Sequence, residues 1–499
     1  MSRDEIRVQY SGFIIFAAQI LSVVTGIIFT LLLTRNMTKP QYGIWSNIFD
    51  FAGYFTLLSG LFPFWATRFV AREKEGAIKT GLFANLIVAL VSVIIYLPLI
   101  SLVTSAFQVG EGYIFLYLIA SLQIINVYMI SILESCLRAV KPQTIGYGLL
   151  IEEVCKVSLA YILIVGFHQL FLGAMLSLII AASIEALYYI RLLAKDLRQR
   201  IRWNYLREWL KGSAANFYNA VGNQLAAFVL ILLFLFGGQA ARGEYQAAAT
   251  FANVVGYASF LAFALYPKLL AKNSLEDVAL SLKTVLMFAI PMAAIIITMS
   301  ESLLTILNVF YATFSPILIL LTLDTVVLLI SQFYSSLLLG IERLDEEAKI
   351  SFNQLVRSKM FKAFTLPYIQ AVIALPTAYY VLTQLATSNS VQAVLYVTTI
   401  NICAHIATFF GLYAIMRKSV RIAVPWRSIG KYLFASAVSA VVLYILPHPT
   451  TILATLGKVT GGVAFYAALL LMIDEEARKL VALIWHEIKG IFGQIYKRY

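Results

Sequence analysis

Apolar stretches that are long enough to cross a lipid bilayer occupy this chain almost from end to end. A spanning helix needs about 20 mostly apolar residues. We place such spans at 11–34, 43–67, 82–105, 113–136, 143–166, 170–190, 213–236, 245–267, 284–300, 314–339, 364–385, 392–415, 429–446 and 451–473. The pattern leaves no room for a large soluble domain. It predicts an all-α polytopic membrane protein with about 14 transmembrane helices, whose function lies in the membrane-embedded helices.

The distribution of charge predicts the orientation. Only 13% of the 499 residues are charged, against about 25% in soluble proteins. The net charge of +13 could indicate a nucleic-acid partner, but 33 of the 38 lysines and arginines fall on alternate connections between spans. Cytoplasmic connections carry such an excess. We therefore expect a multi-pass protein of the cell (cytoplasmic) membrane with both termini cytoplasmic and no nucleic-acid partner.

The densest basic run lies in one of these connections, between residues 191 and 211. Because the cytoplasmic leaflet carries anionic lipids, this run would face their headgroups. Its simplest interpretation is a topology signal. Binding of a particular lipid or partner is an alternative that the sequence does not favour.

An internal repeat relates the two halves of the chain. With an offset of 203 residues, Tyr42 corresponds to Tyr245 and Gly53 to Gly256. The same offset carries the first four spans onto spans that were placed independently. Chance identity of common residues is the alternative, but the agreement of the span positions favours duplication.

The repeat predicts the domain organisation. Each half has six spans, an even number, so the halves share their orientation and a pseudo-twofold axis should run along the membrane normal. The last two spans have no counterpart and form an added hairpin. We expect an N-terminal lobe at 1–196, a C-terminal lobe at 205–416, the appended helix hairpin at 425–473 and a cytoplasmic tail at 474–499.

Ionisable residues within the spans are the first candidates for function, since such groups usually face a cavity or a partner. They include Asp50, Asp324, Glu152, Glu153 and Lys156. Glu152 and Lys156 are four residues apart on one helix face, which predicts an ion pair between them. The alternative is a site that binds an anion or relays a proton. The four carboxyl groups are our candidates for ion coupling.

Basic residues at the span ends are candidates for phosphate binding. Arg35 and Arg242 cap the outer ends of the first and seventh spans, at near-equivalent places in the two halves. Arg68 lies where the second span reaches the cytoplasm. A guanidinium group matches phosphate in geometry and charge. Snorkelling of these side chains toward the lipid headgroups is the alternative interpretation.

Amide side chains are concentrated in the seventh predicted span. Asn219 and Asn223 lie near Phe217 and Tyr218. Amides beside aromatic rings suit sugar hydroxyls and ring faces, so these residues are candidates for sugar binding. Hydrogen bonding between helices explains them equally well.

Motifs for catalysis are missing from the sequence. There is no G-x-x-x-x-G-K-[ST] phosphate-binding loop, and no long outer loop carries paired acidic residues. The three cysteines and four histidines lack the spacing of metal ligands or of a catalytic pair. We expect no catalytic residues, no metal and no cofactor, so the protein should not be an enzyme.

One stretch resembles a known family. The segment TRNMTKPQYGIWSNIFDFAGYFTLLSGLFPFWATRFVARE is similar to the start of polysaccharide-biosynthesis flippases of the multidrug/oligosaccharidyl-lipid/polysaccharide (MOP) exporter superfamily. The matching positions are Arg35, Tyr42, Gly43, Gly60, Arg68 and Arg72. The twelve-plus-two arrangement of spans and the duplication extend the resemblance over most of the chain.

The resemblance implies a function and a site. Members of this family move polyprenyl-phosphate- or diphosphate-linked oligosaccharides from the cytoplasmic to the outer leaflet by alternating access, often driven by ion gradients. By analogy, Arg35, Arg242 and Lys156 would meet phosphate, and residues 429–473 would border the prenyl chain. The sequence departs from the related lipid II flippases because its spans contain few basic residues, namely Lys156 and Lys458.

Three hypotheses follow. The first is a flippase for lipid-linked glycans in polysaccharide or glycoprotein glycan assembly, acting as a monomer with membrane lipids and H⁺ or Na⁺ as partners. The second is an ion-coupled multidrug or small-solute antiporter of the same superfamily, for which twelve helices would suffice. The third is a membrane glycosyltransferase or glycan polymerase, which would require an extended acidic outer loop.

Overall fold

The computed structural model describes residues 3–262, 275–341, 358–386, 389–417 and 424–478. All regular secondary structure in these ranges is helical. Eleven helices among the described residues are long and apolar enough to cross a membrane. The prediction of an all-helical, multi-pass membrane protein is therefore confirmed. The predicted spans 11–34 and 143–166 and the described part of the span 245–267, residues 245–262, coincide with helical segments outside this set of eleven. The count of 14 therefore stays a prediction.

The chain divides into two compact units, which we describe separately. The first comprises residues 1–250 and 344–415, and the second comprises 251–343 and 416–499. This division was not predicted from the repeat. The two six-helix lobes, their boundaries and their pseudo-twofold axis stay predictions.

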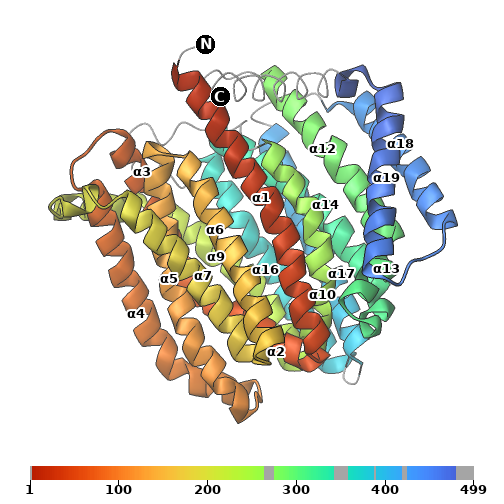
Figure 1. Cartoon of the computed structure of the whole chain (residues 1–499), viewed down its shortest axis with the longest axis horizontal. Coiled ribbons are helices and arrows are strands. Elements are labelled where there is room, and N and C mark those ends of the chain that lie inside the picture. Colours follow the sequence, from red (N-terminus) through yellow and green to blue (C-terminus); the bar gives the residue numbers. More distant parts are fainter. Residues whose placement is uncertain (1–2, 263–274, 342–357, 387–388, 418–423, 479–499) are drawn as a thin grey trace. The chain divides into compact units, whose positions relative to one another are not determined.

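The first unit contains most of the helices (Figure 1). They are α1 (Arg3–Asn36), α2 (Lys39–Thr56), η1 (Leu57–Gly60), α3 (Pro63–Ala71), α4 (Ala77–Ala106), η2 (Glu111–Tyr113), α5 (Ile114–Val140), α6 (Gln143–Ala160), η3 (Tyr161–Gly166), α7 (Leu170–Leu192), η4 (Asp196–Arg198), α8 (Trp203–Gly212), α9 (Ala214–Leu232), η5 (Leu233–Gly237), α10 (Gln239–Gly256), α16 (Lys359–Gln384) and α17 (Ser390–Arg417). Within this unit α1 packs along α6, α4 along α5, and α9 along α16. Helix α10 crosses the unit boundary near its end.

The second predicted span is a broken helix. Its path runs through α2, the short 3₁₀ turn η1 and α3, with Gly60 and Pro63 at the break. A broken helix inside a membrane needs other partners for its freed carbonyl groups. Side chains from three helices supply them: Tyr128 Oη donates to Phe55 O (2.9 Å), Asn85 Nδ2 and Ser131 Oγ to Ser59 O (3.3 and 3.0 Å), and Ser213 Oγ to Leu61 O (2.9 Å).

The second unit contains η6 (Tyr257–Ala262), α12 (Leu275–Thr298), α13 (Ser300–Leu307), η7 (Val309–Phe314), α14 (Ser315–Ile341), α18 (Trp426–Ile445) and α19 (Ile452–Ile473). The hairpin α18–α19 is the predicted appended pair, and it packs on α12. Gly462 allows close approach, because a Cβ there would overlap Leu443. Tyr466 Oη donates to Met287 O at 2.8 Å, and Lys431 pairs with Asp474 at 3.1 Å.

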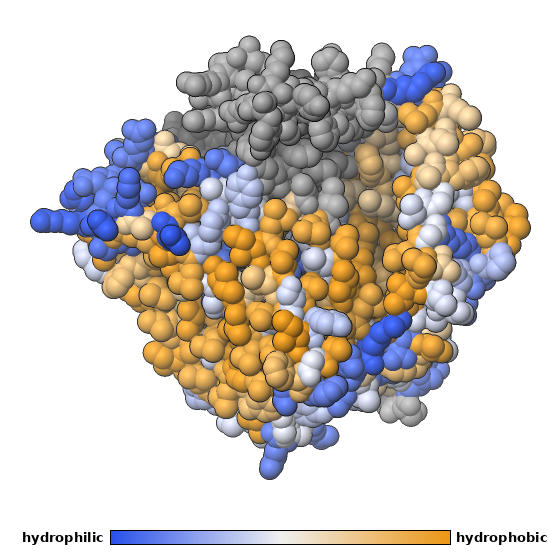
Figure 2. Space-filling model, viewed as in Figure 1, coloured by the Kyte–Doolittle hydropathy of each residue, from blue (hydrophilic) through white to orange (hydrophobic). Residues whose placement is uncertain are grey.

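The lipid-facing character of the surface is visible in Figure 2, where apolar side chains cover much of the drawn face. The exposed apolar residues along α4 include Ile87, Leu90, Val91, Ile94 and Ile95. Their exposure would be unfavourable in water, but a lipid environment accepts them. The multi-pass membrane location thus agrees with the structure as well as with the sequence.

The break in the second span can be tested at Asn85. This side chain is completely buried, and its amide donates to Tyr128 O at 2.7 Å as well as to Ser59 O. We expect Asn85→Ala to lower the free energy of unfolding by about 1–2 kcal/mol, because two buried carbonyls lose a donor. Thermal unfolding in detergent would measure the change. The control is Thr377→Ala, whose exposed hydroxyl bonds only within its own helix; equal losses in both variants would contradict the assignment.

Candidate functional site

Helices α2 and α10 meet at a glycine crossing within the first unit. A Cβ at Gly43 would overlap the carbonyl oxygen of Gln239, and a Cβ at Gly243 would overlap that of Lys39. The two backbones can approach this closely only because both positions are glycine. The crossing brings the first turns of the two helices into contact.

A buried ion pair lies beside this crossing. Arg242 Nε contacts Asp50 Oδ2 at 2.6 Å, and Arg242 Nη2 donates to Asp50 Oδ1 at 2.9 Å. The Arg242 side chain is 3% exposed and that of Asp50 is 16% exposed. The remaining Nη1 donates to Gln246 Oε1 at 3.0 Å. A bidentate pair of this kind combines charge with fixed geometry, so it ties α2 to α10 in one register.

A second ion pair lies at the same crossing. Lys39 Nζ contacts Glu244 Oε1 at 3.2 Å, and Ser390 Oγ from α17 donates to the same carboxylate at 3.3 Å. Glu244 is buried, whereas Lys39 is about a quarter exposed. Two ion pairs therefore hold the crossing together. In one the basic residue comes from α2, and in the other it comes from α10.

The structure brings together two residues that the sequence analysis treated separately. Asp50 was a candidate for ion coupling and Arg242 for phosphate binding. Arg242 does not snorkel outward, since it is buried. The sequence held one signal for the pair: a single acidic residue within the second span and a single basic residue before the eighth, at the end that we predict to be outer. It did not indicate that the two helices cross.

A polar cluster joins α6 to α1. Glu153 Oε1 accepts a hydrogen bond from Ser22 Oγ at 2.7 Å, and Oε2 accepts one from Thr25 Oγ1 and contacts Lys156 Nζ at 2.6 Å. Glu153 is 3% exposed. The predicted ion pair between Glu152 and Lys156 is thus wrong. Lys156 pairs with Glu153, three residues away, because α1 packs on that face of α6 and its two hydroxyl groups hold this carboxylate in place.

Glu152 belongs to a different cluster, with acidic residues that we did not single out. Its carboxyl group lies close enough to that of Glu185 of α7 for the two to interact electrostatically. Tyr189 Oη donates to Glu185 Oε1 at 2.8 Å and lies 3.4 Å from Glu134 Oε1 of α5. Glu134 and Glu185 fall within predicted spans, so their position was the signal that could have found them.

The other predicted site residues occupy varied places. Arg35 is exposed at the end of α1. The Arg68 guanidinium lies 4.1 Å from the centroid of the Phe64 ring. Asp324 is 5% exposed in α14, within the second unit. Among the described residues, no group of three or more His, Cys, Asp or Glu is arranged to hold a metal ion.

Within the described part of the chain, the side-chain amide of Asn223 in α9 bonds to its own helix and not to a neighbouring one. Asn223 Nδ2 donates to Asn219 O at 3.0 Å, within its own helix, and Asn223 is exposed. The neighbouring Tyr218 instead makes the contact with α16: its ring stacks 4.7 Å from Phe361 and 4.5 Å from Tyr368. The sugar-binding role of the amides stays a prediction.

The ion pair at the crossing makes a sharp prediction. Asp50→Asn leaves Arg242 buried without its counter-charge, so we expect the free energy of unfolding to fall by about 3 kcal/mol or more. The charge-swapped variant Asp50→Arg/Arg242→Asp should recover part of this loss. Denaturation in detergent micelles measures both. Glu75→Gln, which removes the exposed partner of Arg202, serves as control with a loss below about 0.5 kcal/mol. A loss in Asp50→Asn no larger than the control would contradict the pair's role.

Comparisons with known proteins agree on the family and fold. The family model described as "Polysaccharide biosynthesis protein" matches residues 10–271. Among solved structures, the lipid II flippase MurJ in an inward closed conformation is similar with a TM-score of 0.68 at 15% identity, covering 93% of this chain and 99% of that chain. An inward-facing multidrug resistance MATE family transporter of the MOP superfamily is similar with a TM-score of 0.55 at 15% identity. The match covers 80% of this chain and 96% of that chain.

A MATE structure in the straight conformation is similar with a TM-score of 0.54 at 15% identity. The match covers 83% of this chain and 96% of that chain. No curated protein sequence matches the chain. The solved structures establish the fold, which this chain shares with the lipid II flippase MurJ and with MATE transporters. The family model spans more than half of the sequence, so this chain belongs to the polysaccharide biosynthesis protein family.

Proposed function

We propose that this protein is a flippase that moves polyprenyl-(di)phosphate-linked oligosaccharides from the cytoplasmic to the outer leaflet by alternating access. The transported glycan would serve polysaccharide or glycoprotein glycan assembly. Membership of the polysaccharide biosynthesis protein family and the likeness in fold to a lipid II flippase support this class of substrate. The main structural support for the mechanism is the contact between α2 and α10, made by the glycine crossing and its two ion pairs.

The contact between α2 and α10 has the properties of a seal, by which we mean a contact that closes one end of the protein and can open again. It joins α2 of the predicted N-terminal lobe to α10 of the predicted C-terminal lobe at a single end, through ion pairs and a glycine crossing. Charged groups regain hydration when they separate into water, so such a contact can open at lower cost than an interlocked apolar one. The placement of basic residues predicts that this end is outer. We therefore interpret the structure as closed toward the outside.

The substrate's phosphate could act on this seal directly. Carboxylate and phosphate both bind a guanidinium group through two parallel hydrogen bonds. In the pair, Asp50 occupies the position on Arg242 that a phosphate would take. Phosphate binding at Arg242 would release Asp50 and loosen the closed end. Arg35, Arg68 and Lys156 are further candidates for phosphate, and Asn219 with Asn223 for sugar.

Ion coupling is a separate part of the proposal. Glu153 is already neutralised by Lys156, so it is poorly suited to bind a further cation. Glu152 and Glu185 lie near each other. Neighbouring carboxylates repel each other unless one of them binds a proton, which makes this pair the better candidate for H⁺ coupling. Asp50 and Asp324 are the remaining candidates. We also propose that the protein acts as a monomer in the cell membrane, with both termini cytoplasmic.

The multidrug antiporter is the second candidate, since MATE transporters share the fold. The extent of the matches favours the flippase. The MurJ structure covers 93% of the chain and the two MATE structures 80% and 83%, a difference comparable in length to the hairpin 426–473. Because the family and the similar structures are transporters, we propose no enzymatic activity.

Transport can be tested in proteoliposomes that contain a fluorescent polyprenyl-diphosphate disaccharide. We expect the parent protein to flip this lipid, and Arg35→Ala and Lys156→Gln each to slow it about tenfold or more, because a charge-assisted hydrogen bond to phosphate is lost. Arg478→Gln, at an exposed residue, should stay within about twofold of the parent rate. If the parent flips no glycolipid but exports small cationic dyes, the antiporter is correct and the flippase proposal fails.

The seal can be tested by accessibility. Ser46 is buried on α2 near the crossing, so a Ser46→Cys variant without the native cysteines should react slowly with an impermeant maleimide added from outside. Adding Asp50→Asn should raise this rate about fivefold or more, because loss of the pair shifts the population toward the open state. Glu75→Gln should leave it unchanged. Equal labelling with and without Asp50→Asn would show that the pair does not hold this end closed.

A further inference from the structure

Basic residues, all exposed except the half-buried Lys79, gather at one end of the first unit, where the α3–α4 turn, the residues before α8 and α8 itself come together. We call this surface the basic platform: Arg72, Lys74, Lys79, Arg198, Arg200, Arg202 and Arg207. Four acidic residues lie in the same segments, Glu73, Glu75, Asp196 and Glu208, so the platform has a net positive charge. Within the described part of the chain, Arg202 is the member that pairs with a carboxylate, that of Glu75.

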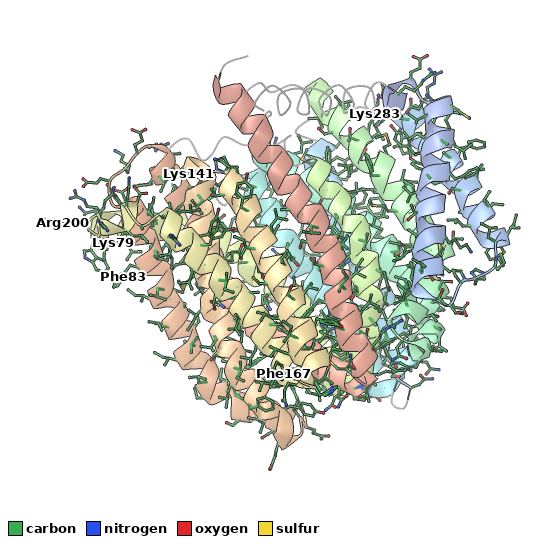
Figure 3. All side chains as sticks on the ribbon, viewed as in Figure 1. Lys79, Phe83, Lys141, Phe167, Arg200 and Lys283 are labelled. Carbon is green, nitrogen blue, oxygen red and sulfur yellow. The ribbon has the colours of Figure 1, made fainter. Side chains whose placement is uncertain are left out.

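Hydrogen bonds and close packing hold the platform segments in fixed positions against one another. Gly76, with φ of 79°, donates its backbone N–H to Gln199 Oε1, and Thr80 Oγ1 accepts the backbone N–H of Arg202 at 2.9 Å. A Cβ at Gly76 would overlap the carbonyl oxygen of Arg200. These contacts fix the basic residues before α8 against the first turn of α4. Figure 3 shows Lys79, Phe83 and Arg200 near one another at this place.

Helix α8 has the two faces of an interfacial helix. Trp209 is completely buried, with its ring 5.4 Å from that of Phe69. On other faces Trp203 is 57% exposed and Leu210 is 52% exposed. The Trp203 ring lies 5.9 Å from that of Phe83 on α4. Exposed aromatic residues beside cations are typical of protein surfaces at the membrane–water boundary.

One face of α4 continues from the platform into an apolar stripe. Lys79, Phe83, Ile87, Leu90 and Ile94 follow the spacing of a single helix face. The four apolar members are 40% to 68% exposed. At 1.5 Å per residue the stripe extends about 22 Å along the helix. Figure 2 shows the matching change from hydrophilic to hydrophobic surface on this side of the molecule.

We propose that this surface is a binding site for an anionic phospholipid. Its phosphate would lie between Lys79 and Arg200, its glycerol region beside Phe83 and Trp203, and an acyl chain along the α4 stripe. The order of cation, aromatic ring and apolar side chains matches the order of groups in a phospholipid. The positive charge selects an anionic headgroup over a zwitterionic one. This inference does not depend on the proposed transport function.

Native mass spectrometry of the full chain in a mild detergent tests the proposal, with phosphatidylglycerol and phosphatidylcholine of equal chain length as probes. We expect phosphatidylglycerol to bind about tenfold more tightly, and Lys79→Gln/Arg200→Gln to remove most of this preference. Lys141→Gln/Arg191→Gln is the matched control, since it removes two exposed cations elsewhere in the same unit; its effect should stay within about twofold. Trp203→Ala should weaken both lipids alike.

Several outcomes would overturn the proposal. Equal loss in the control pair would reduce the effect to general surface charge. Equal affinity for the two lipids would exclude recognition of an anionic headgroup. Displacement of phosphatidylglycerol by millimolar inorganic phosphate would indicate a site for free anions, and displacement by micromolar polyprenyl phosphate would indicate a substrate site. Unchanged melting temperatures of the three variants ensure that these readings report binding and not unfolding.

Discussion

A polar group inside a bilayer has no water to bind, so the protein must supply its partner, and this constraint accounts for the arrangement of the first unit. The broken span α2–η1–α3 exposes carbonyl groups, and Asn85, Tyr128, Ser131 and Ser213 satisfy them from three other helices. The same requirement pairs Glu153 with Lys156 and two hydroxyl groups of α1. Helices in lipid gain little from burying apolar surface, so these polar contacts and close packing select which helices lie together.

The crossing of α2 and α10 combines both kinds of contact. Gly43 and Gly243 let the backbones approach, and the approach places Asp50 within reach of Arg242 and Lys39 within reach of Glu244. The glycines and the ion pairs therefore depend on one another. A larger side chain at Gly43 would separate the charges, and loss of a charge would leave its partner buried without compensation. Under the proposed alternating access, this contact would have to separate when the outer end opens.

Much of the fold could be predicted from the sequence because apolar length is a local property. The predicted spans match helices along the described chain, and the stretch from Arg35 to Arg72 indicated the family that the comparison with family models confirms. The candidate site could be predicted only in part from the sequence. Asp50, Arg242, Glu153 and Lys156 could each be recognised as unusual charges in apolar surroundings. Their partners could not, and the helix-spacing rule chose Glu152 for Lys156 where the structure has Glu153.

The sequence by itself therefore determined that this is an all-helical, multi-pass membrane protein of the polysaccharide biosynthesis protein family, because hydropathy and the family's motif are written in consecutive residues. Only the tertiary structure decided which charges meet. Glu152 and Glu153 are neighbours in the chain, yet one faces Glu185 and the other faces α1, since successive helical residues point about 100° apart and contact different neighbours. Likewise the basic residues before α8 form a platform only because Gly76 and Thr80 bind them to α4. Contacts between distant segments depend on packing, which no local pattern specifies.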